Sequence, residues 1–274
     1  MRKPVQTTFL RRWGNRLLGM LALYLLFAYL ILPRLWAHHE HQPGLASKGA
    51  VTHTADGIPG DPLNVGLVGD RTDLLQAMHT AGWIPADPIT LKSSIEISAS
   101  VVLDRPDNAA PVSPLFFEGR KQDLAFEKPI GKSADRRNHV RFWQVLEAGE
   151  EGRPVWLGSA TLDAGVTLSR DTGQVTHRIA PDIDAERTLL IGDLVKAKVV
   201  TALYQVSGVG PTIAGRNGEG DPYYTDGDIH LAVLSEGAAP VSTPPITEPD
   251  SALVQGKNQI WAGLETLLAP EPAQ

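Results

Sequence analysis

LNVGLVGDRTDLLQAMHTAGW, residues 63–83, joins a short apolar run to an amphipathic segment through a Gly-Asp turn. The run at residues 63–68 is typical of a buried strand, because it is short and rich in valine and leucine. In the segment that follows, apolar side chains recur at helical spacing, at Leu74, Leu75, Met78 and Ala81. Gly82 provides the helix stop. The sequence therefore predicts that the folded domain opens near Pro62 with a β-α unit.

Alternating or β-branched runs predict further strands, separated by turn residues. These runs cover residues 94–103, 139–146, 154–162, 175–179, 199–206 and 229–234. Apolar spacing predicts a second helix at residues 182–196 and a terminal helix at 252–269. Two or three helices set among such strands predict an α+β domain built on one mixed or antiparallel sheet. The pattern is compatible with an elaborated ferredoxin-like core.

An uncharged stretch, LLGMLALYLLFAYLIL at residues 17–32, precedes the domain. If this stretch continues as a helix to Trp36, its rise of about 1.5 Å per residue is enough to span the hydrocarbon layer of roughly 30 Å. Five of the six Lys and Arg residues in the first 36 residues precede the stretch. The positive-inside rule then predicts cytoplasmic residues 1–16 and a transmembrane helix at residues 17–36. The domain that follows would lie on the far side, which in a bacterium is the periplasmic face.

A cleavable signal peptide, cut after Ala37, is the alternative interpretation of the same segment. The apolar run is longer than the usual core of a signal peptide, and Pro33 and Arg34 interrupt the approach to the cut. We therefore expect a retained, single-pass anchor in the cytoplasmic (inner) membrane, with the N-terminus inside.

Composition divides the rest of the chain and excludes several functions. Residues 37–61 lack apolar periodicity, which predicts a linker. The folded domain is then expected at residues 62–238, and a Pro-rich segment followed by a C-terminal helix at residues 239–274. Beyond Trp36, 19 Lys and Arg residues face 31 Asp and Glu residues, a balance of −12. This charge disfavours nucleic acid as a partner. The chain has no cysteine, which excludes disulfides, thiolate metal sites and cysteine nucleophiles.

One polar cluster supplies a candidate metal site at a strand-to-helix turn. Its members are His177, Asp182, Asp184 and Glu186. One imidazole and three carboxylates suit a divalent metal ion, which could activate water for hydrolysis, and His139 is a second candidate for the catalytic histidine. The alternative is structural, because acidic residues favour a helix start and Arg187 can pair with one of them.

Four arginines are candidates for an anion-binding site, since guanidinium groups bind phosphate and carboxylate bidentately. They are Arg120, Arg136, Arg141 and Arg187. Alternatively, these arginines neutralise acidic residues such as Asp123 and Asp184 inside the domain. The tryptophans Trp83, Trp143 and Trp156 are expected to be core anchors rather than a ligand cage.

Several segments together resemble the LssY C-terminal domain family. They are DPLNVGLVGDRTDLLQAMHTAGW (61–83), FFEGRKQDLAFEK (116–128), RRNHVRFW (136–143), PVWLGSATLDAGV (154–166), THRIAPDIDAERTLL (176–190) and TDGDIHLAVL (225–234). The resemblance covers nearly the whole domain after the membrane. It implies anchored proteins, or appendages of DedA-like and lipid-phosphatase-like membrane modules, and so points to lipids or envelope precursors. Asn138 and Arg178 stand where the family pattern often has a second histidine, which counts against a histidine-rich metal site.

Two functional hypotheses follow. The first is a binding or accessory module of the cell envelope that recognises an anionic lipid, a glycan precursor or a protein partner. The second is a metal-dependent hydrolase of a phosphorylated or acylated envelope substrate, with a divalent metal as its cofactor. Convergence of the candidate side chains in an open cleft would favour the enzyme, and burial in ion pairs would favour the module.

Overall fold

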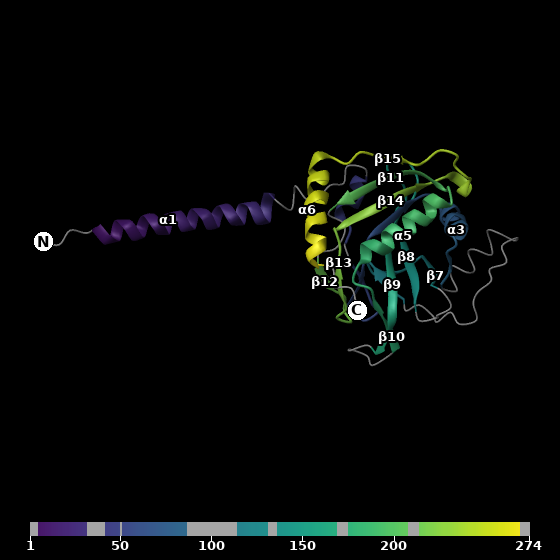
Figure 1. Ribbon diagram of the computed structural model, residues 1–274, viewed down its shortest axis with the longest axis horizontal. Coiled ribbons are helices and arrows are strands. Elements are labelled where there is room, and N and C mark those ends of the chain that lie inside the picture. The colour runs from purple at the N-terminus through teal and green to yellow at the C-terminus, as the bar shows by residue number, and fades with distance from the viewer. Residues whose placement is uncertain are drawn as a thin grey trace.

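The computed structural model describes residues 5–31, 42–49, 51–86, 114–130, 136–168, 175–207 and 214–268. It confirms an α+β chain, in which an N-terminal helix lies apart from a layered domain (Figure 1). Helices cover one face of a large sheet, and a small sheet covers part of the other face. The strand predicted at residues 94–103 lies outside the described residues.

The N-terminal helix α1 (Val5–Leu26) continues into a turn of π-helix at Phe27–Ile31. Within it, Arg11–Ile31 is long and apolar enough to cross a membrane, and none of its most apolar part is buried in the protein. Twenty-one residues at about 1.5 Å each match a hydrocarbon layer of roughly 30 Å. The helix begins well before residue 17, and residues 32–36 of the predicted span lie outside the described part of the chain.

Two helices, α3 (Arg71–Thr80) and α5 (Ile183–Lys196), pack on the same face of the large sheet. The predicted β-α unit at the start of the domain is confirmed, with Asp70 and Asp73 forming a capping box at the first turn of α3. Trp83 and Trp156 are almost fully buried in this layer. Burying one such large apolar side chain contributes on the order of 2–3 kcal/mol, so this layer is the main core.

The large sheet has the strand order β15-β11-β14-β3-β9-β8-β7-β4, with β10 paired to β9. The strands are β3 (Val65–Val68), β4 (Ile84–Pro85), β7 (Leu124–Pro129), β8 (Arg137–Leu146), β9 (Val155–Leu168), β10 (Val175–Ile179), β11 (Val200–Ser207), β14 (Asp228–Leu234) and β15 (Ile246–Thr247). Two neighbouring pairs are parallel, β14 with β3 and β11 with β15, and the others are antiparallel. The sheet is therefore mixed.

The succession β3-α3-β8-β9-α5 matches the first five elements of a ferredoxin-like βαββαβ unit. The core departs from that unit after α5, where a hairpin of β11 and β14 replaces the single last strand. As a result, the strand beside β3 is β14, and it runs parallel to β3. Strands β4 to β7, inserted between α3 and β8, elaborate the unit further.

A small sheet on the opposite face corrects the predicted linker at residues 37–61. It has the order β2-β1-β5-β6, formed by β2 (Pro59–Pro62), β1 (Val51–His53), β5 (Phe116–Phe117) and β6 (Arg120–Lys121). A 3-10 helix at Pro43–Ser47 buries Leu45, and Gln42 donates hydrogen bonds to Glu151 and Tyr204. A lone leucine among polar residues gives no periodic signal, which is why residues 42–61 looked like linker although they belong to the domain.

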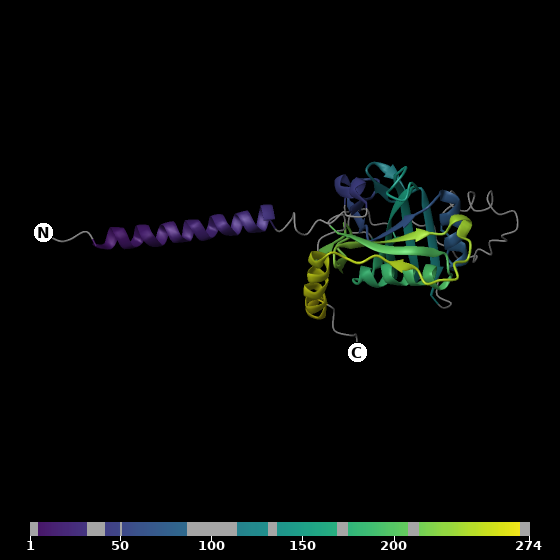
Figure 2. The same cartoon turned by 90° about the horizontal axis from the view of Figure 1, so that it is seen from above.

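The C-terminal helix α6 (Ala252–Leu268) packs against the sheet where β11 ends and β14 begins. Val254 and Trp261 are the buried apolar side chains on its inner face. Figure 2 shows that α6 lies at the end of the domain nearest to α1. A short hairpin of β12 (Ala214–Arg216) and β13 (Pro222–Tyr224) leads into the loop before β14.

Candidate functional site

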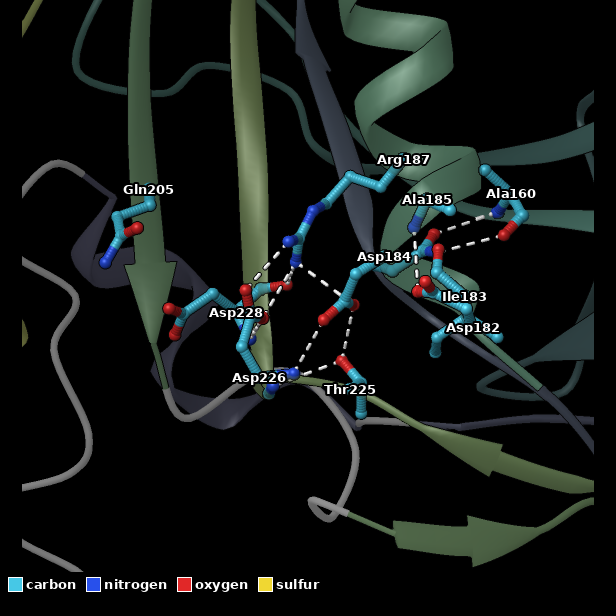
Figure 3. A network of polar contacts seen from close by, with 12 residues as sticks. Ala160, Asp182, Ile183, Asp184, Ala185, Arg187, Gln205, Thr225, Asp226 and Asp228 are labelled. Carbon is cyan, nitrogen blue, oxygen red and sulfur yellow. Dashed lines mark hydrogen bonds and ion pairs between the residues drawn. The ribbon is translucent and has the colours of Figure 1, made fainter. Parts of the chain in front are cut away.

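The first turn of α5 and the loop before β14 meet around one buried guanidinium, that of Arg187 (Figure 3). Its two terminal nitrogens donate to the two carboxylate oxygens of Asp226 at 2.8 and 2.7 Å. Nη1 also donates to the carbonyl oxygen of Asp228 and lies 3.4 Å from Asp184. Asp184 in turn accepts hydrogen bonds from the Thr225 hydroxyl and the Asp226 amide, both at 2.7 Å. We call these five residues the loop cluster.

Burial and opposite charge compete in the loop cluster. Burial alone would lower the pKa of Arg187, but the hydrogen-bonded Asp226, with Asp184 and Asp228, raises it above its ordinary value. Burial pushes the pKa of Asp226 upward, but Arg187 holds it below the usual range. Burial raises the pKa of Asp184 to about 6, against the attraction of Arg187. The guanidinium thus remains charged and fixed, and Asp184 is the more readily protonated of the two carboxylates.

Helix α6 is connected to the loop cluster through Asp228. Lys257 forms a buried ion pair with the Asp228 carboxylate, and Asn258 donates to the side chain of Gln205 on β11 at 3.4 Å. Desolvation, together with the charge of Arg187, lowers the pKa of His230, two residues along β14, to about 3, so this ring is neutral. The ion pair with Asp228, at the start of β14, therefore helps to hold α6 against the sheet.

An open groove of about 690 Å³ lies between α5 and α6. Its lining residues are Asp182, Asp184, Ala185, Arg187, Thr188, Leu189, Gly192, Lys196, Asp226, Trp261 and Glu265. Four of them are carboxylates and two are cations, and Arg187, Asp184 and Asp226 already contact one another in the loop cluster. The groove is therefore rich in hydrogen-bond acceptors, with Trp261 and Leu189 as its apolar part.

The predicted metal ligands are engaged separately. Asp182 is the N-cap of α5 and accepts from the Ala185 amide at 3.0 Å, while Asp184 is held inside the loop cluster. Glu186 is buried elsewhere along α5, and its Oε2 has no hydrogen-bond partner. The side chain of His177 lies outside what the structure describes, although its backbone pairs with Val166. Among the described residues no three His, Asp or Glu side chains are grouped to hold a metal ion.

Glu186 carries the most perturbed of these carboxyl groups. Burial raises its pKa to about 7, and the nearby charges of Asp182, Asp163 and Asp193 raise it in the same direction. The side chain does not line the groove between α5 and α6. It is a buried acid that takes up a proton near neutral pH.

A second set of charges lies on adjacent strands of the large sheet. Arg137 pairs with Glu127 at 2.8 Å and with Asp163 at 3.1 Å, and all three side chains are buried. His139 Nδ1 lies 3.1 Å from Asp163, and its Nε2 lies 2.7 Å from a terminal nitrogen of Arg141. Because arginine can only donate, Nε2 accepts and the ring proton lies on Nδ1, toward Asp163. We call these five residues the strand cluster.

The predicted anion-binding arginines do not come together in one site. Arg141 is buried 3.5 Å from Asp61, and Arg187 is bound to Asp226. Arg120 is half-exposed and pairs with Asp123 at 3.5 Å, while Arg136 is exposed. The alternative expected from the sequence, internal pairing with acidic residues, fits these geometries for Arg120, Arg141 and Arg187.

Sequence reasoning missed several residues that build these clusters. Arg137, not its exposed neighbour Arg136, is the arginine that is buried together with Arg141 on β8. Strand alternation could have found it, because Arg137 shares its face with His139 and Arg141. For Asp226 and Lys257 no local signal exists, since their partners lie 39 and 29 residues away in the sequence.

The comparisons with known proteins bear on the whole domain. No curated protein and no solved structure matches the chain. A family model described as the LssY C-terminus matches residues 40–229, which include both clusters and α5 but end before α6. This match covers more than half of the chain, and the chain therefore belongs to the LssY C-terminus family.

Proposed function

We propose that the chain is a membrane-tethered binding module, and that the groove between α5 and α6 takes a hydroxyl-rich ligand such as the sugar part of an envelope glycan precursor. The observation that carries this proposal is the lining of the groove, where four carboxylates face two cations. Carboxylates only accept hydrogen bonds, and sugar hydroxyls supply the donors that complement them. Trp261 adds an apolar edge of the kind that binding pockets use to orient a ligand.

The same lining distinguishes between two of the three ligands expected from the sequence, the anionic lipid and the glycan precursor. A phosphate or other acidic headgroup would be repelled by Asp182 and Glu265, so an anionic lipid is disfavoured. The arginines that were expected to attract it are paired, Arg187 with Asp226 and Arg141 near Asp61. A neutral, donor-rich glycan meets neither obstacle.

The metal-dependent hydrolase stays an untested prediction. It requires His177 to join carboxylates that the structure places in other roles, Asp182 as a helix cap and Asp184 inside the loop cluster. Adding Mg²⁺, Ca²⁺, Mn²⁺ or Zn²⁺ to the full chain and measuring the melting temperature checks it, because a bound ion stabilises the native state by mass action. A rise that the Asp184→Asn variant loses would revive the hydrolase.

For location, we propose that α1 holds the domain at the periplasmic face of the inner membrane. Arg11, Arg12 and Arg16 lie toward the N-terminal end of the apolar helix, as the positive-inside rule requires for that orientation. A phosphatase reporter fused after Gln274 should then be active outside the cytoplasm, with the full chain in the membrane fraction. An inactive reporter would show that the domain lies in the cytoplasm. Release of a soluble form would show that the segment is cleaved and does not anchor the chain.

The groove itself is tested at Gly192, which lies on α5 and lines it. A Cβ added at Gly192 meets no atom within 4 Å, so the position has open space for an alanine, and we expect the larger side chain of a tryptophan to extend into the groove. The full chain, in nanodiscs, is applied to an array of bacterial envelope glycans. Wild type and Gly192→Ala should retain the same glycans, and Gly192→Trp should bind them at least tenfold more weakly. Binding of no glycan by the wild type, or equal binding by Gly192→Trp, would overturn the proposal.

A further inference from the structure

Helix α6 has an apolar stripe that the domain does not cover. The inner face of the helix, marked by Val254, Lys257 and Trp261, is buried. Four large apolar side chains outside that face remain exposed, Leu253 at 50%, Ile260 at 62%, Leu264 at 39% and Leu267 at 78%. Their spacing of seven, four and three residues places them on one line along the helix. Exposed apolar residues are ordinary when scattered, but a continuous stripe marks an interaction surface.

The exposed surface of α6 has two flanks of different chemistry. At 100° per residue, the stripe lies on one side of the buried face, and Gln255, Gln259 and Thr266 lie on the far side. Neither flank carries a charge, because the two charged residues of α6 are Lys257, which is buried against Asp228, and Glu265, which lines the groove. An amphipathic helix with an apolar stripe and a polar flank is suited to lie in a membrane interface.

The tether between the anchor and the domain keeps this stripe close to a bilayer. The described anchor ends at Ile31, and Gln42 is fixed to the domain by hydrogen bonds to Tyr204 and Glu151. Eleven residue steps reach at most about 40 Å. Tyr204 precedes Gln205, to which α6 is bound through Asn258, so the tether and α6 attach to the same part of β11. In both overall views, α6 lies at the end of the domain toward α1 (Figures 1 and 2).

We propose that α6 lies in the interface of the membrane that α1 crosses, with Leu253, Ile260, Leu264 and Leu267 in contact with the acyl chains. The occupant of the stripe is the bilayer itself, and no particular headgroup is needed, because the flanks of α6 offer no charge to one. The helix lies beyond the residues matched by the family model. The groove between α5 and α6 then opens beside the membrane surface, whatever ligand it takes.

The absence of cysteine makes the proposal directly measurable, since a single introduced cysteine is the one site of labelling. Spin labels are placed in the full chain at Ile260→Cys and Leu264→Cys on the stripe. A label at Gln259→Cys on the polar flank is the matched control, and one at Leu21→Cys in α1 verifies insertion. The protein is reconstituted in phosphatidylcholine vesicles, and collision of the label with apolar oxygen and with a polar nickel complex is compared.

The labels on the stripe should collide at least several-fold more with oxygen than with nickel, relative to Gln259→Cys, and their ratio should approach that of Leu21→Cys. Adding anionic phosphatidylglycerol or raising the salt concentration should leave the ratio unchanged, because the exposed flanks carry no charge. Equal collision ratios at Ile260→Cys and Gln259→Cys, with Leu21→Cys inserted, would overturn the proposal. Protection of the stripe from both reagents with spin-spin broadening would also overturn it, by showing that a second copy covers α6.

Discussion

The strand cluster and the loop cluster combine the same groups, an arginine between two carboxylates, in two different settings. In the strand cluster, Arg137 lies between Glu127 and Asp163 on adjacent strands, whose positions the backbone ladder fixes. In the loop cluster, Arg187 holds Asp226, which belongs to a turn and borders an open groove. The first arrangement therefore holds the sheet together, and the second orders a loop at a surface that a ligand can reach.

The largest effect is expected at the arginine of the strand cluster, Arg137, compared with its exposed neighbour. Arg137→Met leaves the Glu127 and Asp163 carboxylates buried without their cation, which costs about 3–5 kcal/mol of unfolding free energy. Arg136→Met, one residue away on the surface, should change it by less than about 0.5 kcal/mol. Urea unfolding of the full chain in detergent measures both. Equal stability of the two variants would mean that the strand cluster does not hold the sheet.

Breaking the link between the loop cluster and α6 should have a smaller effect. Lys257→Met removes the partner of the buried Asp228, while Arg187 still lies close, so we expect a loss of about 1.5–3 kcal/mol. Hydrogen exchange should then accelerate along α6 and not along α3. Gln259→Met, at an exposed position of the same helix, is the control and should leave exchange unchanged. Faster exchange throughout the domain would show that α6 is not a separate unit.

The buried acid on α5, Glu186, gives a pH-dependent prediction. Because the pKa of Glu186 rises from its ordinary 4.5 to about 7 on folding, its contribution is most favourable below pH 4.5 and is lost as the pH rises through 7. Glu186→Gln removes this penalty and should stabilise the chain by about 1–2 kcal/mol at pH 8, after allowance for solvent screening, and by nothing at pH 4. Melting temperatures at the two pH values measure the difference. Stabilisation of equal size at both would refute the pKa shift.

The smallest effect is expected at the groove. Gly192→Ala replaces a glycine inside α5 at a position with open space for the methyl group, so it should stabilise the helix by about 0.5–1 kcal/mol. Thermal unfolding measures the gain. A loss of stability instead would mean that the groove is filled at this position, and would invalidate Gly192→Trp as its probe.

The parts of the fold with a local signal could be predicted from the sequence. The β-α unit at residues 63–83, the helix at Ile183–Lys196 and the terminal helix all showed apolar periodicity, and each is present. Strand β7 was missed because Glu127 and Lys128 break its apolar run, although Glu127 is buried by its pairing with Arg137. The small sheet was missed because its strands are two to four residues long and gain their stability from the layer they cover.

The candidate site could be predicted only where its contacts are local. A pairing of Arg187 with one of the acidic residues at the start of α5 was expected as the alternative to a metal site, and Asp184, three residues away on the same helix, is such a partner. The bond from Arg187 to Asp226 crosses 39 residues, and the groove depends on where α6 packs. Neither leaves a pattern in the sequence, because both follow from the tertiary arrangement of elements that are each predictable alone.

The central claim, that the groove between α5 and α6 binds a glycan, is tested most directly at Trp261. The full chain is labelled with 5-fluorotryptophan in detergent micelles, and the fluorine resonance of Trp261, assigned from Trp261→Phe, is followed while a glycan retained on the array is added. Trp261 is buried but lines the groove, whereas Trp143 and Trp156 are packed inside the two cores. The Trp261 resonance should shift saturably, whereas the resonances of Trp143 and Trp156 should not move. Gly192→Trp should abolish the shift of Trp261. An unmoved Trp261 resonance at saturating glycan would contradict the claim.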